Sequence, residues 1–109
     1  MPTSIKDFQG IWNITEMDQW DTEPGWFIEF DGEGSGLMEF LCVGVELDHR
    51  MNEDAEGNKR SEFSFHGHDE GDEVFGRGWV EINGDHLNGY FYFHHGEESG
   101  FKASKSKQE

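Results

Sequence analysis

The stretch EVFGRGWVEINGDHLNGYFYFHH, residues 73–95, decides the fold. Residues of contrasting character alternate along Glu73–Ile82 and again along His86–His95, and a period of two is typical of β-strands. Asn83-Gly84-Asp85 separates the two runs, and Asn-Gly is a strong signal for a tight hairpin turn. The stretch therefore predicts two neighbouring antiparallel strands.

Similar alternating runs, separated by turn residues, continue on both sides of this hairpin. They predict strands over Phe8–Met17, Trp26–Asp31, Leu37 to about Leu47, Arg60–Gly67 and Ser99–Ala103. Residues 48–59 are expected to form an exposed loop, and 18–25 a loop or a single helical turn. The sequence therefore predicts an all-β protein, an antiparallel up-and-down meander of seven or eight strands. We expect it to close into a small barrel, because closure removes exposed strand edges.

The length of 109 residues fits one domain, predicted over residues 1–104 with a flexible tail at 105–109. Ile, Leu and Val are scarce, whereas the chain has ten Phe, four Trp and two Tyr. Because a buried aromatic side chain removes roughly 150–250 Å² from water, aromatic residues are expected to build the core. The single cysteine, Cys42, lies in an apolar run and is expected to be a small buried hydrophobe.

The chain is strongly acidic, with 24 Asp and Glu against eight Lys and Arg and a net charge of −16. Nucleic acids and anionic membranes are therefore not expected as partners, since their binders cluster Lys and Arg on one face. The acidity is interpreted mainly as a source of solubility. A basic partner, nucleic-acid mimicry and a salt-adapted surface are the alternatives. No signal-peptide or membrane-spanning stretch is found, so we expect a cytoplasmic protein, either a monomer or a homodimer.

Gly10-Ile11-Trp12, at the head of the first predicted strand, resembles the Gly-x-Trp start of the calycins. These include lipocalins, fatty-acid-binding proteins and nitrobindin-type barrels. The resemblance implies a calycin-like barrel in which Trp12 closes one end.

Four further segments resemble a group of small uncharacterised bacterial proteins. They are Met17–Asp21, Glu62–Gly67, Gly76–Trp79 and Phe93–Phe101. This resemblance covers nearly the whole chain. It implies a shared β-barrel fold and no particular activity.

The polar face of the strand predicted at 60–67 is a candidate site, because Glu62, Ser64 and His66 share one side of it. Facing the barrel interior they would form a functional site, and facing outwards they would be solvated surface. Arg77 lies between two glycines, and Glu62 is its expected partner. That arginine either braces the sheet or binds a carboxylate or phosphate of a ligand.

A set of aromatic residues could line an apolar ligand pocket in the barrel, with Arg77 as its polar anchor: Trp12, Trp26, Phe30, Phe40, Trp79, Tyr90 and Tyr92. The alternative is that aromatic side chains simply fill a narrow barrel. The residues predicted to bind a ligand are Trp12, Glu62, Ser64, His66, Arg77, Trp79, Tyr90, Tyr92 and His94. We therefore expect a binding module for a small apolar or anionic ligand. The alternative is an acidic protein-interaction or structural module.

A hydrolase-type enzyme is the less favoured function, because no nucleophile motif is present. Ser64 or Ser99 beside His66 or His94 would be its candidate groups, and no catalytic residue is assigned. His66-Gly67-His68 directs two imidazoles the same way, as a metal site needs, but the spacing to further ligands is not diagnostic. We therefore expect no metal and no cofactor. If a metal were bound, His66 and His68 would be the candidate ligands.

Overall fold

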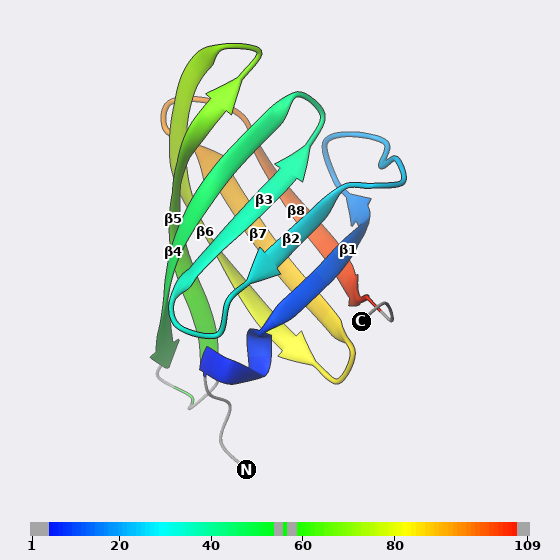
Figure 1. Cartoon of the computed structure of the whole chain (residues 1–109), viewed down its shortest axis with the longest axis vertical. Helices are drawn as coiled ribbons and strands as arrows, with labels where there is room; N and C mark the ends of the chain where they lie inside the picture. The colour runs from blue at the N-terminus through cyan, green and yellow to red at the C-terminus, as the bar shows by residue number, and fades with distance from the viewer. Residues whose placement is uncertain (1–4, 54–55, 57–58, 107–109) are drawn as a thin grey trace.

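The computed structural model describes residues 5–53, 56 and 59–106, which fold into a closed antiparallel barrel (Figure 1). A short 3-10 helix, η1, spans Ile5–Phe8. The strands of the described residues are β1 Gly10–Met17, β2 Phe27–Phe30, β3 Ser35–Phe40, β4 Val43–Glu53, β5 Lys59–Asp69, β6 Asp72–Asn83, β7 His86–Phe93 and β8 Glu98–Lys105. They follow each other around the barrel in chain order, which confirms the up-and-down meander.

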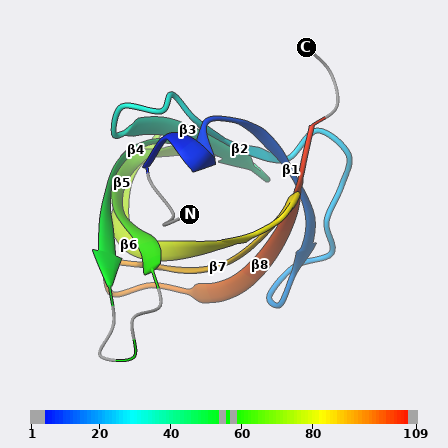
Figure 2. The ribbon, with the colours of Figure 1, turned by 90° about the horizontal axis from the view of Figure 1, so that it is seen from below.

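The barrel closes where β1 pairs antiparallel with β8. Trp12 lies opposite Lys105, and Met17 lies opposite Phe101. Lys105, which we expected in the tail, is therefore the last residue of a strand. Residues 107–109 of that expected tail lie outside the described residues. Figure 2 shows the ring of strands seen along the barrel, with η1 at the near end.

The single strand predicted from Leu37 to Leu47 is wrong, because the chain reverses at Leu41 and Cys42. Phe40 pairs with Val43 across this two-residue turn, and the φ of Leu41 is 51°. Positions 40 and 43 both face inwards, so inward-facing residues have even numbers before the turn and odd numbers after it. This change explains why apolar residues fell on both faces of the single predicted strand. Cys42 is exposed in the turn, so its predicted burial is also wrong.

The loop predicted over residues 48–59 is also wrong over most of its length. Strand β4 continues to Glu53 and pairs with β5 up to the Glu53–Lys59 pair. The polar composition is misleading because Asp48, Arg50 and Asn52 point outwards, while His49 points inwards. Residues 54, 55, 57 and 58 lie outside the described part of the chain.

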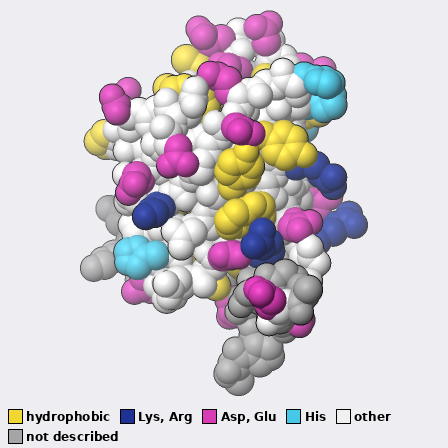
Figure 3. Space-filling model, turned by 180° about the vertical axis from the view of Figure 1, so that it is seen from behind, with side chains coloured by type: hydrophobic (Ala, Val, Ile, Leu, Met, Phe, Trp, Pro, Cys, Tyr) yellow, Lys and Arg dark blue, Asp and Glu magenta, His cyan; other side chains and the backbone are white. Residues whose placement is uncertain are grey.

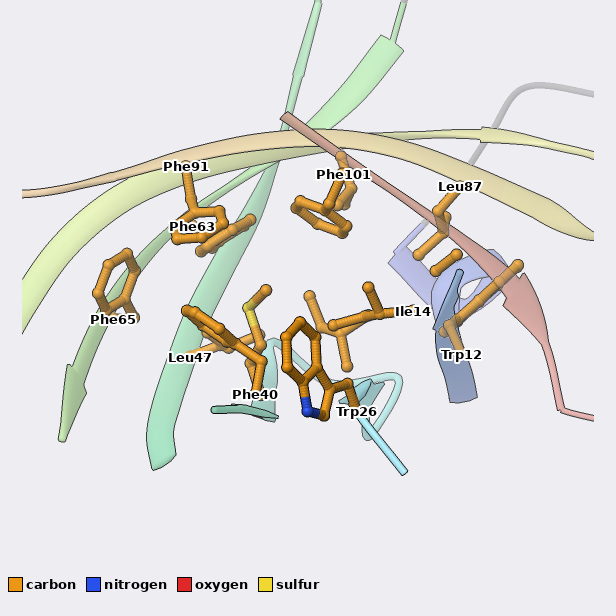
Figure 4. Close-up of a cluster of buried hydrophobic side chains, with 14 of the residues drawn as sticks. Trp12, Ile14, Trp26, Phe40, Leu47, Phe63, Phe65, Leu87, Phe91 and Phe101 are labelled. Atoms are coloured by element: carbon orange, nitrogen blue, oxygen red, sulfur yellow. The ribbon is translucent and has the colours of Figure 1, made fainter. Parts of the chain in front are cut away.

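The inward-facing side chains of the strands pack into one hydrophobic cluster, part of which is shown in Figure 4. Aromatic side chains dominate it, as the composition predicts. Phe91 contacts Phe40, Phe65 and Phe101 edge to face, with ring centroids 5.2–6.2 Å apart. Such edge-to-face contacts add to the free energy gained by burial alone. The barrel interior is therefore built as a packed aromatic core.

Both ends of the barrel are covered by segments outside the strands. At one end η1 inserts Phe8, whose carbonyl oxygen accepts a hydrogen bond of 2.8 Å from the Trp12 indole N–H. At the other end the loop over residues 18–25 places Trp20 against Phe40 and Phe91. Within the described residues, no helix has the length and apolar character needed to cross a membrane.

Candidate functional site

The polar face of β5 points away from the barrel interior. Phe63 and Phe65 are buried in the core, so Glu62, Ser64 and His66 between and beside them face outwards. Of the two interpretations made from the sequence, the structure shows the outward one, so these side chains lie on the solvated outer wall and line no pocket inside the barrel. The neighbouring strands repeat this arrangement on their outer sides, where Arg77 and Trp79 belong to β6 and Tyr90 and Tyr92 to β7. Trp12 lies apart from them inside the barrel, with 1% of its surface exposed.

The strand register brings six of the predicted residues together in two rows that run across the sheet. Ser64 pairs with Arg77 and Arg77 with Tyr92, while Glu62 pairs with Trp79 and Trp79 with Tyr90. An open hollow of about 720 Å³ lies over these rows, and it extends to Asp48, Arg50 and Asn52 of β4. In Figure 3, hydrophobic side chains gather among charged ones over the strands that lie at the back of Figure 1.

Arg77 does not pair with Glu62, contrary to our expectation from the sequence. The register places Glu62 diagonally from Arg77. The carboxylate of Glu62 instead accepts a hydrogen bond of 2.6 Å from the Asn52 side-chain amide. The residue directly opposite Arg77 on β5 is Ser64, which carries no charge. Among the described residues, no carboxylate forms an ion pair with Arg77. Its guanidinium is therefore available in the hollow.

The bracing role that we considered for Arg77 belongs to Arg60 of β5. Its guanidinium donates a 2.8 Å hydrogen bond to Glu81 and lies 4.2 Å from the centroid of the Trp79 ring. Trp79 in turn lies beside Tyr90, with ring centroids 6.5 Å apart and an interplanar angle of 28°. A hydrogen bond to Glu98 raises the pKa of the Tyr90 hydroxyl. These contacts form a cross-strand ladder that limits the rotamers of the rings beside the hollow.

All three arginines of this acidic chain lie on the same outer face. Arg60 is held in the ladder, whereas Arg50 and Arg77 line the hollow. Within the described residues, Arg50 forms one ion pair, with Asp48 at 3.4 Å, and the two side chains are 82% and 61% exposed. An ion pair so exposed contributes little, because water and salt screen it and both side chains lose entropy. The hollow therefore presents two guanidinium groups that a ligand can engage.

His66 and His94 lie outside the hollow, on either side of Phe75. His66 Nε2 lies 2.6 Å from a carboxylate oxygen of Glu73, and this hydrogen bond lowers the pKa of Glu73. His94 stacks on Phe75 with a centroid separation of 4.8 Å. The rings of His66 and His68 are 6.5 Å apart. In the described part of the chain, no three His, Cys, Asp or Glu side chains come together as a metal site.

The sequence reasoning missed a buried pair, His49 and Ser61. The His49 Nδ1 and Ser61 Oγ are 2.7 Å apart, and both residues are at most 1% exposed. Burial lowers the pKa of His49, although the carboxylates of Asp31 and Asp48 oppose this effect. Its Nε2 atom is buried without a hydrogen-bond partner among the described residues. The sequence holds one signal for this pair, because His49 lies two residues after Leu47 and therefore on the same inward side of a strand. The signal applies only if that strand continues past Asp48, where we predicted a loop.

The other serine–histidine pairs considered from the sequence do not form in the described residues. Ser99 accepts a hydrogen bond from the backbone N–H of Gln19 and donates one to the carbonyl of Gly100. His66 is held by Glu73 and His94 by Phe75. The His49–Ser61 pair has the distance that nucleophilic catalysis needs, but both residues are at most 1% exposed, so a substrate does not reach them.

The chain is therefore a small up-and-down β-barrel with a hollow of polar and aromatic side chains on its outer wall. No family model, curated protein or solved structure matches the chain.

Proposed function

We propose that this protein is a calycin-like binding module that holds a small anionic ligand with a flat apolar body in the hollow over β4–β7. The observation that carries the proposal is Arg77. Its guanidinium has no acidic partner among the described residues, although the chain contains 24 acidic residues. Such an unpaired cation beside aromatic rings fits an anion as its partner.

The groups around Arg77 match the two parts of such a ligand. The guanidinium is a planar fork that donates paired hydrogen bonds to a carboxylate or phosphate. The Ser64 hydroxyl lies on the strand position opposite and supplies a further donor. Tyr92 lies on the other side of Arg77 and is 42% exposed, so its ring offers apolar contact. The packed aromatic core further supports placing the ligand outside the barrel rather than inside it.

Titration by NMR tests the proposal, with benzoate and phenyl phosphate as anions and benzyl alcohol as the uncharged control. We expect the anions to shift the Trp79 indole and Tyr92 signals, and Arg77→Gln to weaken their binding at least about tenfold. Lys102→Gln, on the outer face of β8, is the matched control and should bind as the unmodified protein does. Native mass spectrometry of freshly purified protein would reveal a ligand that copurifies. Equal binding by the Arg77→Gln variant, or no binding of either anion, would contradict the proposal.

A second candidate function, an acidic protein-interaction module, is favoured by the end of the barrel opposite η1. The segment from Ser61 to Gly76 contains no Lys or Arg, and Asp69, Glu70, Asp72 and Glu73 cluster within it. A basic partner would be attracted to this end, and salt would screen the attraction. Binding of a lysine-rich peptide that weakens steeply with salt, and that is lost when these four acids become amides, supports this function. Retained binding by that variant rules it out.

We also propose a cytoplasmic location and membership of the group of small bacterial barrels that the sequence resembles. The exposed thiol of Cys42 supports a reducing compartment, because an exposed free cysteine is liable to oxidation elsewhere. The four segments quoted above support the group.

A further inference from the structure

We infer that the ligand of the hollow is an acidic oligosaccharide that lies across strands β4–β7. This inference rests on the proposed function, because it assigns Arg77 the same role. It adds the chemical class of the ligand, the orientation of the ligand across the strands and a second cationic contact. Each of these comes from a separate feature of the hollow.

The hollow is elongated across the strands and open to water. Its lining side chains come from four adjacent strands, β4, β5, β6 and β7. Three strand spacings of about 4.8 Å give a trough roughly 14 Å long, which exceeds a single sugar or benzene ring. A ligand in an open trough keeps one side in water, so that side must be hydrophilic. A chain of sugar rings, apolar on the ring face and hydroxylated at its edges, meets both requirements.

Arg50 supplies a second cationic anchor at the β4 end of the trough. It pairs with Glu62, whereas Arg77 pairs with Ser64, so the two arginines are separated by two strand spacings and one two-residue step. This separation places their Cα atoms about 12 Å apart. Two acidic groups on different sugar units of one ligand can therefore each meet a guanidinium.

Between these two anchors the trough is polar and carries a negative charge. The carboxylate of Glu62 lies there, held by the Asn52 amide at 2.6 Å. A ligand with a charge on every unit, such as a nucleic-acid backbone, would be repelled at this point. Hydroxyl groups would instead donate to Glu62 and accept from Ser64, which is the pattern that a sugar provides.

The aromatic residues of the trough complete the match to a sugar. Tyr90, Tyr92 and Trp79 line one end of it. Tyr and Trp side chains combine a large apolar ring with a polar atom, so they contact the C–H face of a sugar while remaining partly hydrated. Because Arg60 and Trp79 hold each other in place, this end is ordered before the ligand arrives.

The test is isothermal titration at low salt with three ligands: glucuronic acid as the monomer, an acidic tetramer in which glucuronic acid alternates with N-acetylglucosamine, and the neutral N-acetylglucosamine tetramer. We expect the acidic tetramer to bind at least about tenfold more tightly than the monomer, and the neutral tetramer to bind at least about tenfold more weakly than the acidic one. Arg77→Gln should weaken both acidic ligands. Arg50→Gln should weaken only the tetramer, because the monomer cannot reach both anchors. Lys102→Gln serves as the control.

The outcomes separate this inference from the proposed function. If benzoate or the monomer binds through Arg77 but chain length has no effect, the oligosaccharide is ruled out and the anion site stands. If no anion binds, both fail. Equal binding of the neutral and acidic tetramers also overturns the inference. Both arginines are exposed, so their variants should fold, and an unchanged NMR fingerprint away from the trough verifies this.

Discussion

The guanidinium of Arg60 lies 4.2 Å from the ring centroid of Trp79 while it donates a hydrogen bond to Glu81. All three side chains are on the outer wall of the barrel, where β5 and β6 pair. The contact joins two strands outside the hydrophobic core and restrains Trp79, which lines the hollow over β4–β7.

We predict that Arg60→Gln destabilises the protein by about 1 kcal/mol. A cation–π contact at a partly exposed site contributes about 0.5–1 kcal/mol, and an ion pair of this kind adds a few tenths. Arg50→Gln is the matched control, because its pair with Asp48 is far more exposed, and it should change stability by less than about 0.5 kcal/mol. Urea unfolding followed by tryptophan fluorescence measures both. Equal losses for the two variants would show that the Trp79 contact contributes nothing.

We predict that Gly76→Ala destabilises the barrel by about 1–3 kcal/mol or more. A Cβ atom at this position would collide with the carbonyl oxygen of Tyr92 and lie 2.6 Å from Cζ of Phe65. Gly44→Ala is the matched control in a neighbouring part of the sheet, since its Cβ atom would meet nothing within 4 Å. That substitution should be neutral or stabilise by up to about 1 kcal/mol through the unfolded chain. Thermal unfolding distinguishes the two, and similar melting temperatures would contradict the packing argument.

We predict that the stability of the protein falls as the pH is lowered from 6.5 to 5, because of His49. Burial lowers the pKa of His49 in the folded state, so the unfolded state binds the proton more readily. Stability is therefore complete above about pH 6.5 and falls below it, by at most about 1.4 kcal/mol per pH unit for one group. The lowered pKa values of Asp31 and Glu73 also reduce stability on acidification, but only as the pH falls below the ordinary values of 3.8 and 4.5 for these two groups.

Urea unfolding at pH 5.0, 6.0 and 7.5 measures this pH dependence, and variants assign it. His49→Gln should remove much of the slope, because the amide still reaches Ser61 but does not titrate. His86→Gln changes an exposed histidine and should leave the slope in place. An unchanged slope in the His49 variant would exclude His49 as its source.

We predict that Cys42 reacts with a thiol reagent in the native protein about as fast as in the unfolded chain. The cysteine is exposed in the turn between β3 and β4, so its labelling requires no unfolding. Native and urea-unfolded protein are compared by mass spectrometry after short labelling pulses. Protection of the native thiol would restore the buried strand expected from the sequence and disprove the turn.

The fold was largely predictable because its signals are local. Alternation along residues 73–82 and 86–95 and the Asn83-Gly84 turn are readable without knowledge of the rest of the chain. The turn at Leu41 and Cys42 was not, since it contains no Gly, Asn, Asp or Pro and places a leucine at positive φ. At this turn the burial of Val43, Val45 and Leu47 in the core determines the structure, although the local residues do not favour a turn.

The candidate site was predictable in its residues but not in its contacts. Glu62, Ser64 and Arg77 were identified from strand parity and residue chemistry. Their pairing depends on the register between β5 and β6, which moves Glu62 one two-residue step from Arg77 and frees the guanidinium. The His49–Ser61 pair was out of reach, because it needs the full length of β4 and its register with β5.

The pairing of Trp12 with Lys105 also dictates when the protein can finish folding during synthesis. The first strand must wait for the last one, so a nascent chain that stops before Glu98 keeps two open strand edges, on β1 and β7. Open edges invite pairing with other chains. With synthesis at about 5–20 residues per second, seconds pass between the appearance of β1 and its closure. We expect the chain to be most prone to aggregate in that interval.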